Sequence, residues 1–167
     1  MSEQLPVSHV ASEFYAWLWW ASERNECRFD LAEIGRVDVW VDERLAFRSP
    51  DPNEKVSAVM TGMNPSAFLE SRAALAGGKV LQDLRLAIRR DDREFSVTLK
   101  GPAMEFQGAK LPQAVSGDEA IYDRMFLYEE LAFLVAGLFA DFAAVRTSPR
   151  WQQDVLPAIQ AWVIGES

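Results

Sequence analysis

Cysteine and histidine are nearly absent from this chain of 167 residues, which holds one of each, Cys27 and His9. A single cysteine excludes a disulfide scaffold, and the two residues together are too few for a zinc site of the Cys/His type. A catalytic dyad that needs two histidines is excluded for the same reason. Any chemistry must therefore come from carboxylates, basic side chains and hydroxyl groups.

Long apolar runs are also missing, so no segment is predicted to span a bilayer. The first residues, MSEQLPVSHVASEF, lack the positive and apolar regions of a signal peptide. Together with one unpaired thiol, this predicts a cytoplasmic protein. Positive charge is scarce too, because 17 Lys and Arg stand against 25 Asp and Glu, a formal net charge of −8. This balance excludes a globally basic nucleic-acid binder and leaves room for a local basic face.

The spacing of apolar residues predicts a helix over residues 9–26, with Phe14 and Trp17 on its inner side. From Arg36 the period changes to two, which is typical of strands. Asp42-Glu43-Arg44 is interpreted as a turn between two of them. Strands are expected over residues 37–41, 45–48, 55–63, 79–90, 93–100 and 104–106, and a short helix that begins at Asn64-Pro65 is inserted after the third.

Ser116-Gly-Asp-Glu119 matches a capping box and predicts the start of a helix that continues to about Arg146. Two apolar stripes, Ile121 to Phe142 and Leu127 to Leu138, predict that its second half is buried nearly all round. A last helix carries Trp151–Trp162. The pattern predicts one α+β domain over residues 1–167. Its antiparallel sheet has a short inserted helix and is packed by an N-terminal helix and a long C-terminal helical pair.

No set of residues typical of a catalytic centre is visible. Gly77-Gly78-Lys79 follows a predicted helix and precedes a strand, the reverse of a phosphate-binding loop, so it indicates a helix C-cap. Asp38 and Asp42 need further acids to hold a metal, and a solvated face is the simpler interpretation. His9 has no partner for acid–base chemistry, and Cys27 lacks a strongly basic neighbourhood. We therefore expect a non-enzymatic protein without metal or cofactor.

The central segment, residues 79–100, is the basic part of the sequence, with six Lys or Arg against four Asp or Glu. Arg85 and Arg89 share one face of a predicted strand, and Lys100 is expected on the same side of the next strand. Such a stripe suits the evenly spaced charge of a nucleic-acid backbone. The alternative is a wet sheet face whose arginines pair with acids across the strands.

The order of segments along the chain resembles a known family. These segments are VDVWVDERLAF at 37–47, AGGKV at 76–80, LRLAIRRDDREFSVTLKG at 84–101, MEFQGAKLP at 104–112 and DRMFLYEELAFLVAGLF at 123–139. Together they resemble the C-terminal half of the recombination-associated protein RdgC family, over about residues 10–142. The resemblance implies a nucleoid-associated, non-enzymatic protein. Members bind double-stranded DNA with little sequence preference, modulate recombination and form a ring-shaped homodimer. The residues expected to contact the DNA backbone are Lys79, Arg85, Arg89, Arg90, Lys100 and Lys110.

Two features depart from this family. Its members carry an additional N-terminal half that helps to close the ring, and the sequence here continues past the family's closing helix with Trp151–Trp162. The departures argue against a DNA-encircling ring. The alternative function is an oligomeric interaction or assembly subunit that keeps the fold without binding DNA. Large aromatic rings dominate interface energetics, so its protein interface is expected at Trp19, Trp20, Trp151 and Trp162. Filling of the core is the other interpretation of these four residues.

Overall fold

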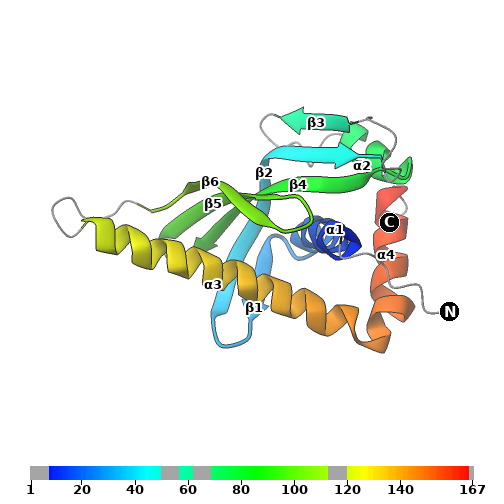
Figure 1. The fold of residues 1–167 in the computed structure, drawn as a ribbon. Helices are drawn as coiled ribbons and strands as arrows, with labels where there is room; N and C mark the ends of the chain where they lie inside the picture. The colour runs from blue at the N-terminus through cyan, green and yellow to red at the C-terminus, as the bar shows by residue number, and fades with distance from the viewer. Residues whose placement is uncertain (1–7, 50–56, 62–68, 113–119, 166–167) are drawn as a thin grey trace.

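The computed structural model describes residues 8–49, 57–61, 69–112 and 120–165 (Figure 1). Over these residues the chain forms a six-stranded antiparallel sheet and four α-helices, which confirms the predicted α+β class. The helices are α1 (Ser8–Arg24), α2 (Leu69–Ala76), α3 (Ala120–Arg146) and α4 (Leu156–Val163), and the π-helical turn η2 (Trp151–Val155) precedes α4. The strands are β1 (Arg28–Leu31), β2 (Gly35–Arg48), β3 (Ser57–Thr61), β4 (Val80–Arg90), β5 (Arg93–Lys100) and β6 (Glu105–Lys110).

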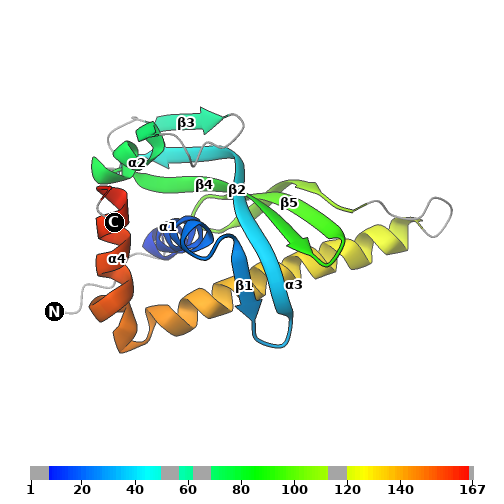
Figure 2. The same cartoon turned by 180° about the vertical axis from the view of Figure 1, so that it is seen from behind.

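The sheet has the order β1-β2-β4-β5-β6, and β3 pairs with the end of β2. Three residues of β2, Asp42 to Arg44, lie opposite the single residue Arg85 of β4. The extra residues make β2 bulge and bend, as Figure 2 shows, while it keeps pairing with β4 on both sides. The turn predicted at this position is therefore wrong, and the two short strands predicted around it are one long strand.

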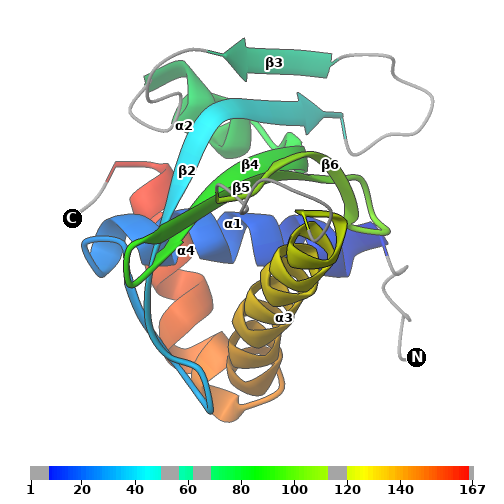
Figure 3. The same ribbon diagram turned by 90° about the vertical axis from the view of Figure 1, so that its left-hand side faces the viewer.

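Helix α1 lies under the curved sheet, and α3 lies beside α1 (Figure 3). Phe14 and Trp17 of α1 are buried, as their spacing predicts. The ring of Phe142 on α3 joins the layers, because its centroid lies 5.4 Å from that of Phe14 and 5.7 Å from those of Trp17 and Trp151. Within the core, α1, α3 and η2 thus share one aromatic cluster, which continues into the buried aliphatic side chains of the sheet.

A glycine lets α3 approach the hairpin formed by β1 and β2. A Cβ atom at Gly137 would lie 2.7 Å from Cδ1 of Ile34 and 3.3 Å from Cδ1 of Leu31. The first distance is too short for two carbon atoms, so the helix can be this close to the hairpin because residue 137 has no side chain. The predicted capping box at Ser116–Glu119 and the predicted helix start at Asn64-Pro65 lie outside the described residues.

Candidate functional site

Helix α3 has apolar residues on two opposite sides. Leu131, Leu134 and Leu138 are fully buried against the rest of the protein. The other side holds large apolar side chains that are exposed by 44% at Tyr128 up to 68% at Phe126. Monomeric proteins rarely leave so many large apolar residues together in solvent, and such patches mark interaction sites. The exposed large residues of this helix are Ile121, Tyr122, Met125, Phe126, Tyr128 and Phe133.

At 100° per residue these six side chains lie on one continuous side of the helix together with exposed alanines. The side extends from Ile121 to Ala144, about 36 Å at the rise of an α-helix. Glu129 is its one charged residue. We call this surface the α3 outer face. Its members are Ile121, Tyr122, Met125, Phe126, Tyr128, Glu129, Ala132, Phe133, Ala136, Ala140 and Ala144.

The prediction that the second half of α3 is buried nearly all round is wrong. Phe133 is half exposed, and Ala136, Ala140 and Ala144 are exposed as well. In the stripe that starts at Ile121, the first residues are exposed, and burial begins only at Val135. The physical reason is that the sheet and α1 cover only one side of the helix. Apolar periodicity shows which sides of a helix are apolar, but it does not show which of them is covered within the same chain.

Arg85, predicted to contact a nucleic-acid backbone, is instead buried within the sheet, with 9% of its surface exposed. Its two terminal nitrogens donate hydrogen bonds to the carbonyl of Gly108 and to the hydroxyls of Thr98 and Ser96, at 3.0–3.2 Å. The carbonyl of Gly108 belongs to a bulge in β6, where the residue has a φ of +58°. Arg85 therefore holds β5 and β6 to β4 and is not an external cation.

Arg89 belongs to a row of alternating charges that crosses four strands. Arg28 lies opposite Asp38, Asp38 opposite Arg89, and Arg89 opposite Glu94. The guanidinium of Arg89 bonds to the Asp38 carboxylate at 3.0 Å, and Arg36 approaches the same carboxylate at 3.8 Å. Arginines thus pair with acids across the strands, which is the predicted alternative to a cationic stripe.

Arg90 and Arg93, at the tip of the β4–β5 hairpin, both bond to Glu130 of α3. Arg93 contacts both carboxylate oxygens, with an Nη2–Oε1 distance of 2.7 Å, and Arg90 lies 3.4 Å from Oε1. Arg90 also donates to the carbonyl of Ile34. Arg90 thus links the hairpin to the helix, and its contact with a nucleic-acid backbone stays a prediction.

We expect Glu130→Gln to lower the free energy of unfolding by about 1–3 kcal/mol, because two guanidinium groups lose their shared charged partner. Denaturant titration at low protein concentration measures this change. Glu129→Gln is the matched control, since Glu129 is the exposed neighbour on the same helix and forms no ion pair with another described residue. Equal effects of the two substitutions would contradict the link between hairpin and helix.

The three lysines among the predicted DNA contacts form no ion pair among the described residues. Lys100 and Lys110 are exposed, and Lys79 is half-buried. In the sheet Lys100 lies between two acids, opposite Asp83 on β4 and opposite Glu105 on β6. The six predicted contacts therefore do not form one free cationic surface.

The tryptophans expected at a protein interface mostly serve the interior. Trp19 and Trp151 are buried, so placing an interface on them is wrong. Trp19 and Trp162 stack edge to face at 4.7 Å, and both indole nitrogens donate to the carboxylate of Glu23, at 3.1 and 2.7 Å. This contact fastens α4 to α1. Trp20 is half-buried beside Arg24, whose guanidinium lies 5.2 Å from the ring.

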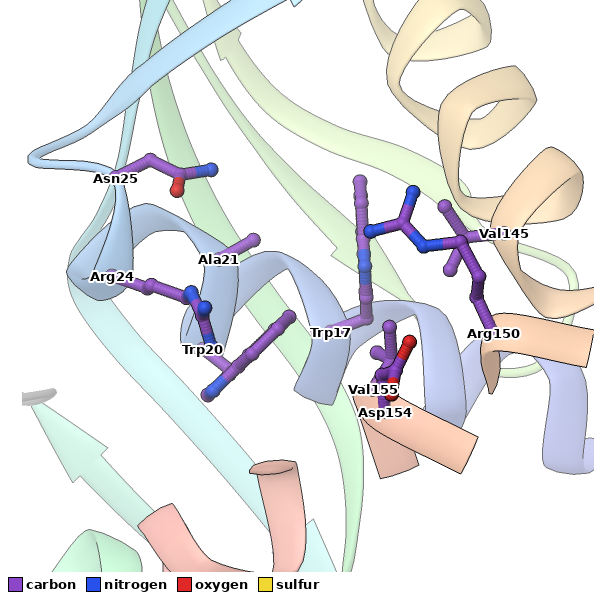
Figure 4. Close-up of a pocket in the computed structure, with 9 residues that line it drawn as sticks. All are labelled: Trp17, Trp20, Ala21, Arg24, Asn25, Val145, Arg150, Asp154 and Val155. Atoms are coloured by element: carbon purple, nitrogen blue, oxygen red, sulfur yellow. The ribbon is translucent and has the colours of Figure 1, made fainter. Parts of the chain in front are cut away.

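Trp20 and Arg24 also form one wall of a cavity of about 230 Å³ (Figure 4). The opposite wall is formed by Trp17 of α1, Arg150 just before η2 and Asp154 within η2. The cavity is smaller than the ligand pockets of roughly 300–1,000 Å³ that are common in proteins. Its charged side chains have mixed sign, so its shape and charge define no ligand class.

Two potential nucleophiles, Cys27 and Tyr15, have raised pKa values. Burial, with a further contribution from Asp38 and Glu23, raises the pKa of the Cys27 thiol, which keeps it protonated and weakly nucleophilic at neutral pH. Burial also raises the pKa of Tyr15, and its hydroxyl donates to the carbonyl of Gly101 at 2.7 Å. The described residues contain no group of three or more His, Cys, Asp or Glu able to hold a metal ion.

In the described part of the chain, no single helix is long and apolar enough to cross a membrane. By length and composition alone, α3 and the segment Trp151–Val163 meet the requirement as a pair bent by 89°. Comparison with known proteins finds no family model, no curated protein and no solved structure that matches this chain. The α3 outer face is therefore identified as the candidate site from its own residues.

Proposed function

We propose that this protein is an assembly subunit that associates with a second copy of itself through the α3 outer face. The observation that carries the proposal is the set of six large apolar side chains exposed on one side of α3. A large apolar side chain presents about 200 Å² when fully exposed. At the exposed fractions in the structure, the six therefore leave about 700 Å² in solvent. This is close to the 800 Å² or so that each partner buries in a standard interface.

Charge also favours this surface for self-association. The chain carries a formal net charge of −8, so two copies repel each other over most of their surfaces. The α3 outer face holds one charged residue, Glu129, over about 36 Å of helix. Contact there brings together two surfaces that carry little like charge. Depletion of charge at the centre of an interface and enrichment of Tyr, Phe and Met are typical of protein–protein contacts.

We expect Phe126→Glu combined with Phe133→Glu to weaken self-association by at least about 100-fold, because two carboxylates would have to be buried in the contact. Sedimentation equilibrium from about 1 to about 200 μM detects a dimer whose dissociation constant is micromolar or lower, and dilution to nanomolar concentrations with a fluorescent label measures tighter association. The matched control is Gln152→Glu combined with Gln153→Glu, which adds the same charge at exposed positions on η2. It should associate like the unchanged protein. An unchanged protein that stays monomeric over this range would overturn the proposal.

Duplex-DNA binding, which the resemblance to the RdgC family implies, stays a prediction. The exposed cations Lys100 and Lys110 support it, whereas the ion pairs of Arg89 and Arg90 reduce the charge available for phosphates. Fluorescence anisotropy with labelled duplex at about 50 mM salt tests it, since weak backbone binding is strongest at low salt. Binding that is lost on Lys100→Glu/Lys110→Glu would favour it, and no binding at micromolar protein would rule it out.

A further inference from the structure

We infer that the two copies pair with their α3 helices antiparallel, across a two-fold axis that passes near Ala132. This inference rests on the proposed self-association and adds its geometry. It follows from the uneven distribution of side-chain size along the α3 outer face. The large residues Ile121, Tyr122, Met125 and Phe126 lie in the first two turns.

The later turns of the same face hold small residues, Ala136, Ala140 and Ala144. In an antiparallel pair each bulky first half lies against the alanines of the other copy, so the helices keep one separation along their length. In a parallel pair Tyr122 and Phe126 would meet their own copies and hold the first halves apart, and the alanines would face a gap. Close packing without gaps favours the antiparallel arrangement.

The position of Glu129 favours the same arrangement. A parallel pair in register brings the two Glu129 carboxylates directly opposite each other, which is unfavourable for like charges. With an axis near Ala132, each Glu129 lies opposite a position about six residues further along the partner helix. This separates the two residues by about 9 Å along the helix axis. Antiparallel helices also place opposite ends of their dipoles together.

A two-fold arrangement uses the same patch on both copies, so it closes on itself and predicts a dimer.

Cysteine crosslinking tests the geometry in the full chain with Cys27→Ser. A disulfide needs Cα atoms no further apart than about 7 Å. Ala132→Cys, close to the axis, should therefore crosslink to its own copy under mild oxidation. Ala140→Cys alone should fail to crosslink, because the two copies of residue 140 lie near opposite ends of the contact.

A mixture of Met125→Cys chains and Ala140→Cys chains should give the mixed disulfide, since these positions face each other across the axis. Self-crosslinking of Ala140→Cys, or absence of the mixed disulfide, in a protein that sedimentation shows to be dimeric would overturn the antiparallel geometry and leave the proposed function standing. A monomer in sedimentation overturns both. The two failures are thus distinguishable. If the protein is a monomer, its binding to lipid vesicles in a flotation assay, or to an added protein, would identify another occupant of the α3 outer face.

Discussion

Phe142→Ala is expected to lower the free energy of unfolding by about 3–5 kcal/mol, the range for removing a buried aromatic ring from a packed core. Phe142 is almost fully buried on α3. Its ring contacts those of Phe14 and Trp17 on α1 and of Trp151 on η2. The substitution leaves a cavity between the three elements that contact this ring. Denaturant titration followed by circular dichroism measures the change.

The matched control for this substitution is Phe133→Ala on the same helix. Phe133 is 53% exposed, so its removal should change the free energy of unfolding by less than about 1 kcal/mol when the protein is dilute enough to be monomeric. At higher concentration the same substitution should lower the apparent stability, because a dimer contact is then lost. A loss at Phe133 as large as that at Phe142 in dilute protein would contradict the division of α3 into an inner and an outer side.

Arg85→Glu is expected to destabilise the protein by roughly 3–5 kcal/mol, the cost of leaving a buried charge without a partner. The guanidinium of Arg85 donates four hydrogen bonds to neutral oxygens of Ser96, Thr98 and Gly108. A carboxylate at this position would face the carbonyl of Gly108, which cannot donate a hydrogen bond. Thermal and denaturant unfolding of the purified variant measure the loss. This loss is a large part of the total stability of a typical domain, about 5–15 kcal/mol.

Arg89→Glu is the control for Arg85→Glu, because the Arg89 side chain is 52% exposed and its pair with Asp38 lies on the surface. Its effect should be about 1 kcal/mol or less. A stable Arg85→Glu variant would contradict the buried position of Arg85.

The difference in stability between Arg85→Glu and Arg89→Glu also decides which variants can test DNA binding. Loss of binding in Arg85→Glu would report unfolding, so charge reversal at Lys100 and Lys110 is the informative change.

The regular parts of the fold could be predicted because their residues repeat with a clear period. The alternation of Phe95, Val97 and Leu99 with polar neighbours defines β5, which begins and ends at the predicted residues. The four-residue strand β1 was not predicted, since Phe29 and Leu31 are its only apolar residues and give too short a pattern. The sequence predicts a turn at the bulge in β2, because Asp42-Glu43-Arg44 is polar and its position opposite β4 is not visible in the residues of β2 alone.

The candidate site was harder to predict than the fold. Period-two spacing correctly places Arg85 and Arg89 on one face of β4, but it does not reveal that the neighbouring strands bury the first and that Asp38 neutralises the second. Likewise, the apolar periodicity of α3 predicts both stripes but places both in the core. The sequence signal for the outer face is the width of the apolar surface, because the two stripes together cover two sides of the helix. When the protein covers only one of these sides, the other is available for a partner.

The contact of Trp19 and Trp162 with Glu23 ties α1 to α4. Because the two indoles are far apart in the sequence, this contact cannot form until the segment that contains Trp162 has left the ribosome. Until then the carboxylate of Glu23 and the ring of Trp19 lack this partner. A chain truncated before Trp162 would keep α1 without the contact that holds α4 against it.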